Sequence, residues 1–159
     1  MQAVKTEGDR PNTPGFTLPE VIVVVTIISI IVAIGVPTLV SYWRAARLSA
    51  GASEVRTLLN VARQEAIRRN DSVCVEYLGL RFRLRQTNCG GTALTLPGTD
   101  GNGWFTLAND IEVSGTTANV VFSYLGGVAT PGQYTVRDRT GTAQTTTVTV
   151  LTSGRVTIP

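Results

Sequence analysis

Apolar and polar positions follow three successive patterns along the chain, and each pattern predicts a different structure. Residues 21–43 contain no charged side chain, and this run exceeds the roughly 20 apolar residues that cross a bilayer core of about 30 Å. Beyond residue 71 the apolar period falls to two, which is typical of strands. Between these regions apolar residues recur at alternating spacings of four and three, which predicts one stripe along a helix: Leu48, Ala52, Val55, Leu59, Ala62 and Ala66.

The apolar run at 21–43 and the apolar stripe that follows it together predict one continuous helix. No glycine or proline interrupts residues 52–69, and the sequence "RRNDS" at 68–72 supplies a stop signal. A helix from Phe16 to about Arg69 would be roughly 80 Å long at about 1.5 Å per residue. We expect its first half to lie in lipid and its second half to pack under a β-domain.

The third pattern predicts an antiparallel sheet with one face against the helix. The stretch "SVCVEYLGLRFRLRQ" alternates on both sides of Gly79, which predicts a hairpin. Residues 87–103 form a long glycine-rich loop. Further short strands are expected at "NVVFSYL", "QYTVRD", "TTTVTVL" and "RVTIP". The expected fold class is therefore α+β, with a long N-terminal helix packed against a C-terminal antiparallel β-sheet domain.

Composition argues against enzymatic chemistry. The 159 residues include no histidine, which is the commonest general base and metal ligand, and the carboxylates are too scattered to indicate an acid–base pair. The sequence "DGNG" at 100–103 begins like a calcium loop, but Trp104 and Phe105 occupy positions that need a ligand and a glycine. We therefore expect no catalytic residue, no metal site and no cofactor.

Two cysteines, Cys74 and Cys89, both follow the apolar run. They would form a disulfide if the domain faces an oxidising compartment, and would stay free thiols if it does not. Two thiols without histidine make a poor zinc site, which usually has four ligands. The disulfide is the favoured interpretation.

The apolar run itself admits more than one kind of membrane segment. Basic residues flank it on both sides, so charge counting does not decide which side of the membrane holds the domain. An ordinary cleaved signal peptide has an apolar core of about 7–15 residues, and this run is longer. A plain, uncleaved signal anchor is therefore a stronger alternative than a cleaved signal peptide.

One charge at the edge of the apolar run points to a family. The stretch "GFTLPE" at 15–20 resembles the prepilin signature of type IV pilins and type II secretion pseudopilins. The resemblance implies that a leader peptidase cuts between Gly15 and Phe16 and methylates the new N-terminal Phe16. Glu20 then becomes the fifth residue of the mature chain, and Pro37 stands where pilins often have a helix-bending proline. Pro19 replaces the usual aliphatic residue, which a helix tolerates in its first turn.

A physical argument supports a paired role for Glu20. An uncompensated carboxylate in hydrocarbon costs of order 2–3 kcal/mol even on lenient scales, so a partner is expected. Cleavage creates one, the α-amine of a mature Phe16 on the same or a neighbouring subunit. The resemblance implies that Glu20 pairs with a neighbour's amine and sets the axial register of a filament. The alternative is a glutamate that reaches the lipid headgroups.

Other stretches narrow the resemblance to minor pilins of the FimT/GspH type. "LLNVARQEAIRRNDSVCV" at 58–75 is similar to the end of their long helix, and "NGWFTLAND", "VVFSYLGGVATPGQYTVRD" and "TVTVLTSGRVTIP" extend the match. The implied domains are a prepilin leader at 1–15, a transmembrane and assembly half-helix at 16–43, an amphipathic half-helix at 44–70 and a periplasmic β-rich domain at 71–159.

The resemblance implies a structural subunit at or near the tip of a type IV pilus or type II secretion pseudopilus. The implied partners are other major and minor pilins through the N-terminal helix, the prepilin peptidase and methyltransferase, and the inner membrane, which the helix crosses once. One alternative is a DNA-binding minor pilin that acts in DNA uptake. Another is a single-pass, membrane-anchored β-domain outside any filament, which would lack processing.

The DNA alternative depends on a few arginines. Arg81, Arg83 and Arg85 are expected on one face of a strand, and Arg155 lies near the C-terminus. A solvated sheet face, or contacts to acidic neighbours in a filament, explains them without DNA. Some FimT-like pilins bind DNA through a Gly-Arg-x-Arg motif, but here Thr157 replaces the second arginine. The net charge of +3 is also modest.

Overall fold

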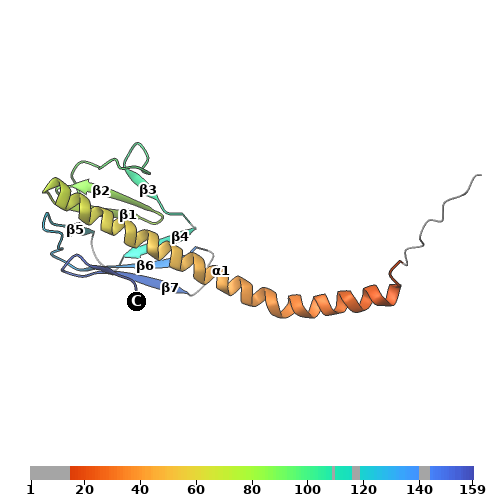
Figure 1. The fold of residues 1–159 in the computed structure, drawn as a ribbon. Coiled ribbons are helices and arrows are strands. Elements are labelled where there is room, and N and C mark those ends of the chain that lie inside the picture. Colours follow the sequence, from red (N-terminus) through yellow and green to blue (C-terminus); the bar gives the residue numbers. More distant parts are fainter. Residues whose placement is uncertain (1–14, 109, 116–118, 140–143) are drawn as a thin grey trace, which may run out of the picture. The chain divides into compact units, whose positions relative to one another are not determined.

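A computed structural model describes residues 15–108, 110–115, 119–139 and 144–159 of the chain. Its contacts divide the chain into two compact units, Met1–Val40 and Ser41–Pro159. One helix, α1 (Leu18–Arg69), contributes to both units. Figure 1 shows α1 and the strands that follow it.

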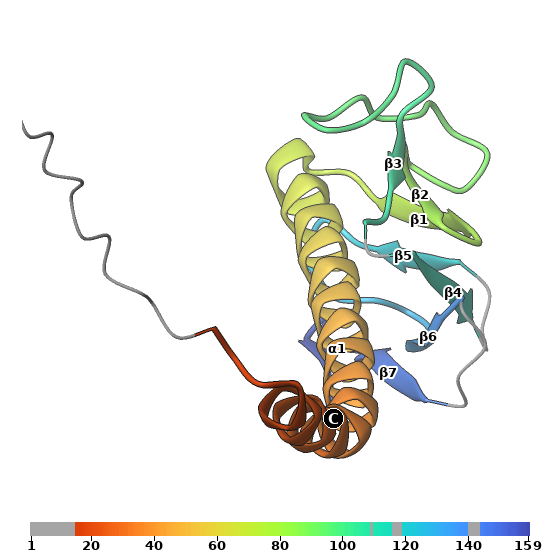
Figure 2. The same cartoon turned by 90° about the vertical axis from the view of Figure 1, so that its right-hand side faces the viewer.

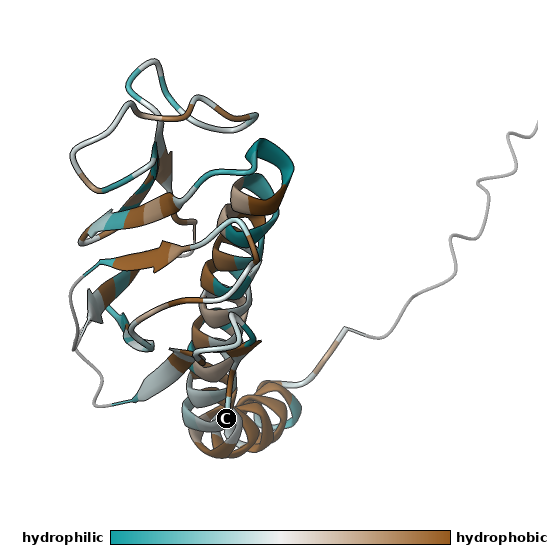
Figure 3. Cartoon of the chain, turned by 90° about the vertical axis from the view of Figure 1, so that its left-hand side faces the viewer, coloured by the Kyte–Doolittle hydropathy of each residue, from teal (hydrophilic) through white to brown (hydrophobic). Residues whose placement is uncertain are grey.

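In the first unit, α1 exposes an apolar surface. Large apolar side chains between Val21 and Val40 are 41–70% exposed, and this part of α1 is mostly brown in Figure 3. The hydroxyls of Thr26 and Ser29 donate to the carbonyl oxygens of Ile22 and Val25, at 2.8 and 2.7 Å. Such bonds satisfy polar groups where no water is available. By length and composition, α1 can cross a membrane.

In the second unit, α1 buries the stripe that the sequence predicts. Leu48, Ala52, Val55, Leu59, Ala62 and Ala66 are all buried, which confirms the helical spacing. The helix ends as its sequence indicates, because Asn70 adopts a positive φ of 51°, which asparagine tolerates better than most residues. The amide N–H of Asp71 donates to the carbonyl oxygen of Ala66, and that of Asn70 donates to Ile67. This Schellman pattern satisfies carbonyl groups at the helix end.

The strands form antiparallel sheet packed against the helix, which confirms the predicted α+β fold class, and they divide into two sheets. The first sheet has the order β3-β2-β1-β5, and the second has the order β4-β6-β7-β8. Figure 2 shows both sheets beside the second part of α1. The strands are β1 (Val73–Leu78), β2 (Arg81–Gln86), β3 (Trp104–Thr106), β4 (Ile111–Gly115), β5 (Val120–Phe122), β6 (Gly132–Asp138), β7 (Thr145–Val150) and β8 (Val156–Thr157).

The expected hairpin around Gly79 is confirmed, and it also joins the two sheets. β1 pairs with β2 in a register that places Leu78 opposite Arg81. The amide of Val113 in β4 donates to the carbonyl oxygen of Gly79 at 3.1 Å. Nearby, the amide of Gly115 donates to the Tyr77 hydroxyl at 3.0 Å. The turn of the hairpin therefore connects the edge of the second sheet to the first.

A continuous apolar core fills the space between α1 and the sheets. Phe82, Phe122 and Tyr134 are among its largest buried side chains, each at most 2% exposed. The Tyr134 ring packs edge-on against Tyr77, with ring centroids 5.5 Å apart. Edge-on aromatic pairs of this kind contribute about 0.5–1.5 kcal/mol beyond their buried area. Both sheets are thus held to the same core.

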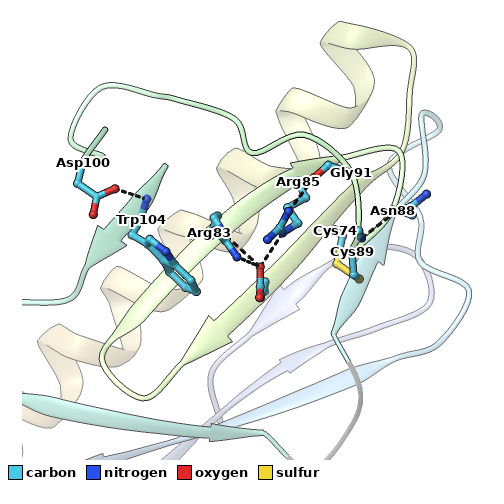
Figure 4. A network of polar contacts seen from close by, with 10 residues as sticks. Cys74, Arg83, Arg85, Asn88, Cys89, Gly91, Asp100 and Trp104 are labelled. Atoms are coloured by element: carbon cyan, nitrogen blue, oxygen red, sulfur yellow. Dashed lines mark hydrogen bonds and ion pairs between the residues drawn. A yellow bond between two sulfur atoms is a disulfide. The ribbon is translucent and has the colours of Figure 1, made fainter. Parts of the chain in front are cut away.

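A disulfide closes the loop that follows β2. Cys74 in β1 is bonded to Cys89, 15 residues later, and Figure 4 shows the bond beside Asn88. A cross-link around a loop of this size stabilises a fold by about 3 kcal/mol in the chain-entropy account. Cys74 is completely buried, so the bond ties a surface loop to the middle of the first sheet.

Candidate functional site

The residues expected at the cleavage point lie just before α1. Gly15, Phe16 and Thr17 precede the first helical residue and are exposed, and the Phe16 side chain is 82% exposed. A peptidase needs an extended and accessible backbone at the bond that it cuts. The bond between Gly15 and Phe16 lies outside the helix and is accessible in the structure.

Glu20 faces the beginning of its own helix. Its Oε2 atom lies 3.5 Å from the backbone nitrogen of Thr17 and 3.4 Å from the Thr17 hydroxyl. Thr17 and Glu20 therefore have the spacing of a capping box, with long hydrogen bonds. A carboxylate here also interacts favourably with the positive end of the helix dipole. Cleavage after Gly15 would create an amine one residue from Thr17, close to this carboxylate.

Pro37 lies inside α1, in the exposed part of the first unit. A proline has no N–H, so the carbonyl group four residues earlier loses its helical partner. The Thr38 hydroxyl donates to the carbonyl oxygen of Ile34, at 3.3 Å. This bond is made to the carbonyl group next to that of Ala33, the one that Pro37 leaves without its helical partner.

A second set of predicted residues forms a polar cluster on the first sheet. The guanidinium groups of Arg83 and Arg85 both donate to Oε2 of Glu76, at 2.8 and 2.7 Å (Figure 4). Arg85 also donates to the carbonyl oxygen of Gly91, at 2.8 Å. The Arg83 guanidinium lies 4.2 Å from the centre of the Trp104 ring, which is a cation–π geometry.

The other two predicted arginines are not part of this cluster. Arg81 is exposed at the start of β2, and Arg155 is exposed in the turn before β8 in the other sheet. Because Glu76 pairs with both Arg83 and Arg85, Arg81 is the one arginine of the expected stripe on β2 that has no ion pair among the described residues. Phosphate binding needs several cations that are free to pair. Nothing in this arrangement specifically favours DNA.

Sequence reasoning missed Glu76 and Trp104, which complete the cluster. The hairpin places Glu76 directly opposite Arg83, and β3 places Trp104 opposite Arg83 on the other side. The first pairing has a signal in the sequence, because the alternation on both sides of Gly79 sets the register. Trp104 has no such signal, since β3 follows a long loop.

The Glu76 carboxyl has a lowered pKa. Burial raises this pKa, but hydrogen bonds from Arg85 and Arg83 outweigh burial, so the pKa lies below the ordinary value of 4.5. The unfolded chain therefore binds the proton more tightly than the folded chain does. The stabilisation is present above pH 4.5 and is lost as the pH falls through the lower folded value.

We expect Glu76→Gln to lower the free energy of unfolding by about 1–2 kcal/mol at pH 7, since two charge-assisted hydrogen bonds weaken. The difference from the parent chain should shrink as the pH falls below 4.5. Urea unfolding of the full chain in detergent, followed by tryptophan fluorescence, measures both. Glu112→Gln is the control, because the Arg137–Glu112 pair is more exposed, with side chains 53% and 38% accessible, and should matter little. A pH-independent difference for Glu76→Gln would contradict this account.

Two family models match the chain. The model described as "Type II transport protein GspH" matches residues 51–154, which is more than half of the sequence. The chain belongs to the GspH family. A second model, the prokaryotic N-terminal methylation motif, matches residues 10–36 and spans the Gly15–Glu20 segment. This GspH-family chain is accordingly a minor pilin or pseudopilin, which confirms the FimT/GspH resemblance.

Solved structures of two minor pilins share the fold of this GspH-family chain. One is the type IV minor pilin FimU of Pseudomonas aeruginosa, with a TM-score of 0.55 and 16% identity over 74% of this chain and 92% of FimU. The other is EpsH, a minor pseudopilin from the Type 2 Secretion System of Vibrio cholerae. EpsH has a TM-score of 0.55 and 14% identity over 71% of this chain and 96% of EpsH. No curated protein matches the sequence.

An apolar groove of about 500 Å³ lies between α1 and the loop after β2 in this GspH-family fold. Glu54 lines it and accepts a hydrogen bond from the Ala108 amide, and Glu65 lines it and pairs with Arg68 and Arg69. Its carboxylates are thus engaged within the chain. Among the described residues no group of His, Cys, Asp or Glu side chains could hold a metal ion.

Proposed function

We propose that this chain is made as a precursor, cut between Gly15 and Phe16, methylated at Phe16 and assembled into a filament at or near its tip. The observation that carries the proposal is the joint occurrence of a methylation motif at 10–36 and an exposed apolar helix with one carboxylate at its start. The filament is of the type II secretion or type IV pilus class. In it the chain supports assembly and protein secretion.

The proposed partners follow from the two units of the chain. Residues 16–43 cross the inner membrane once before assembly and then pack against the equivalent helices of other major and minor pilins. Residues 44–70 and the β-rich domain at 71–159 lie in the periplasm, where a Cys74–Cys89 disulfide is stable. Residues 1–15 are the leader that a prepilin peptidase removes, and the same enzyme class supplies the methyl group.

Filament recovery tests this proposal. The full chain is co-expressed with a prepilin peptidase and the other pilins of its organism, and filaments are sheared from the cells and sedimented. The processed chain is expected in the filament fraction. Its retention in the membrane fraction while the other pilins sediment would contradict the proposal and favour a plain membrane-anchored domain.

A further inference from the structure

An apolar patch with a buried arginine nitrogen lies where α1 ends in the second unit. Ile67, Tyr124, Leu125 and Leu151 are 50%, 52%, 76% and 42% exposed. Beyond residue 43, these four make up all but one of the exposed large apolar side chains among the described residues, Leu78 being the other. We name Ile67, Tyr124, Leu125, Leu151 and Arg63 the end patch.

Two glycine turns build the end patch around Arg63. One turn follows β5, where the amide of Gly126 donates to the carbonyl oxygen of Ser123. The other follows β7, where the amide of Gly154 donates to Leu151. A methyl group at Gly126 would lie 3.0 Å from Nε of Arg63 and 2.9 Å from Cδ1 of Ile67, and one at Gly154 would lie 3.2 Å from the same Nε. The arginine therefore lies directly against both turns.

Arg63 lacks a partner in this setting. Its Nε atom is buried and has no hydrogen-bond partner among the described residues, and no ion pair to it is present in the described part of the chain. Burying an N–H donor without a partner is costly, and guanidinium groups that lose part of their water are normally paired. The Arg63 side chain as a whole is half-buried, and a half-buried guanidinium beside exposed apolar side chains matches a carboxylate that is itself flanked by apolar groups.

We propose that the end patch binds another filament subunit through a carboxylate that pairs with Arg63 and is flanked by apolar side chains. This inference rests on the proposed function, because it takes the partner to be a pilin. An aromatic and three aliphatic side chains around one arginine resemble the anchors of protein interfaces. Nucleic acid would instead need several free cations to neutralise phosphates.

A second copy of this chain fits the end patch poorly. Every described side-chain carboxylate in residues 41–159 already has an intramolecular partner, so a second copy would have to break one such contact. These carboxylates are Glu54, Glu65, Asp71, Glu76, Asp100, Asp110, Glu112 and Asp138. The partner is therefore a different subunit.

Photo-crosslinking in cells tests the end patch. The full chain carries p-benzoylphenylalanine in place of Leu125, or of Leu78 as the control, which is also exposed, at 68%, but lies on β1. Each of these two substituted chains is co-expressed with a prepilin peptidase and with the other pilins of the organism, one pilin at a time. We expect a cross-link from position 125 to one of them, at a peptide that contains Asp or Glu, and about tenfold less from position 78.

Variants of Arg63 show whether charge pairing holds the partner. Arg63→Gln should reduce the cross-link about tenfold, whereas Arg56→Gln, seven residues earlier and exposed on the same helix, should leave it unchanged. Arg63→Glu should abolish it, and replacing the contacted partner carboxylate by arginine should restore it. Restoration excludes misfolding of the variant as the cause of the loss.

Several results would overturn the inference. They are cross-links only between copies of this chain, equal cross-links from positions 125 and 78, no effect of Arg63→Gln, or duplex DNA binding that Arg63→Gln removes. Leader removal is measured by mass in the same samples. A processed chain that enters filaments without a cross-link from position 125 rejects the end patch alone. A chain that keeps its leader rejects the proposed function and the inference together.

Discussion

Glu20→Ala is expected to reduce recovery of the chain in filaments about thirtyfold or more. Pairing with an amine offsets the cost of a carboxylate in hydrocarbon, and removing one member of such a pair leaves the other charge buried alone, which costs about 3–5 kcal/mol. Glu20→Gln should behave like Glu20→Ala, because it keeps the size of the side chain but loses the charge. Filament sedimentation with quantitative immunoblotting measures the effect.

Thr17→Ala is the matched control for Glu20→Ala. It removes the hydroxyl 3.4 Å from the Glu20 carboxylate and weakens the capping box, but it leaves the charge in place. Filament entry should therefore be largely retained. If Thr17→Ala lowered recovery as much as Glu20→Ala does, the role of Glu20 would be helix capping. If Glu20→Ala entered filaments like the parent chain, charge pairing would be rejected.

Gly154→Ala is expected to destabilise the second unit by about 3 kcal/mol or more. Gly154 has φ of 74°, which L-residues adopt at a cost of roughly 1–2 kcal/mol. An added methyl group would also overlap the backbone carbonyl oxygen of Gly126, and a backbone atom cannot move aside as a flexible side chain can. The two glycine turns would have to separate. Urea unfolding of the full chain in detergent measures the loss.

Gly79→Ala separates the cost of a positive φ from the cost of the steric overlap. Gly79 also has a positive φ, of 58°, but a methyl group there would meet nothing within 4 Å. Its cost should therefore be that of the positive φ alone, about 1–2 kcal/mol. Equal costs for Gly79→Ala and Gly154→Ala would show that the close approach of the turns adds nothing.

The sequence predicts the helix of this chain better than it predicts the sheets. Helical spacing identifies the buried stripe because residues three and four apart share a face, whatever the rest of the fold does. Gly51 is also buried on this stripe, and a methyl group there would overlap the Ile111 side chain. A glycine has no side chain that reveals such an approach, so the sequence does not indicate it.

The division into two sheets depends on contacts between distant residues. β4 was not identified as a strand, and it pairs with β6, which is separated from it by β5 of the other sheet. Alternation within a strand shows that it is half-buried but not which strand lies beside it. The predicted α+β fold is therefore confirmed, but the sequence does not indicate the division into two sheets.

The candidate sites also differ in how far the sequence predicts them. The segment around Gly15 and Glu20 is visible in the sequence because its residues are neighbours along the chain. The sequence also indicates Arg83 and Arg85, and the hairpin register could have placed Glu76 opposite Arg83, whereas Trp104 follows a long loop and has no such signal. The end patch combines one helix position with two turns that follow different strands. Its members are far apart in sequence, so only the structure brings them together.

The mass of the native chain, purified from cells that make its own prepilin peptidase, tests the central claim most directly. We predict a single species that lacks residues 1–15 and carries one added methyl group on the amine of Phe16. A native chain that still contains residues 1–15 would contradict the account, because Glu20 would then have no amine to pair with.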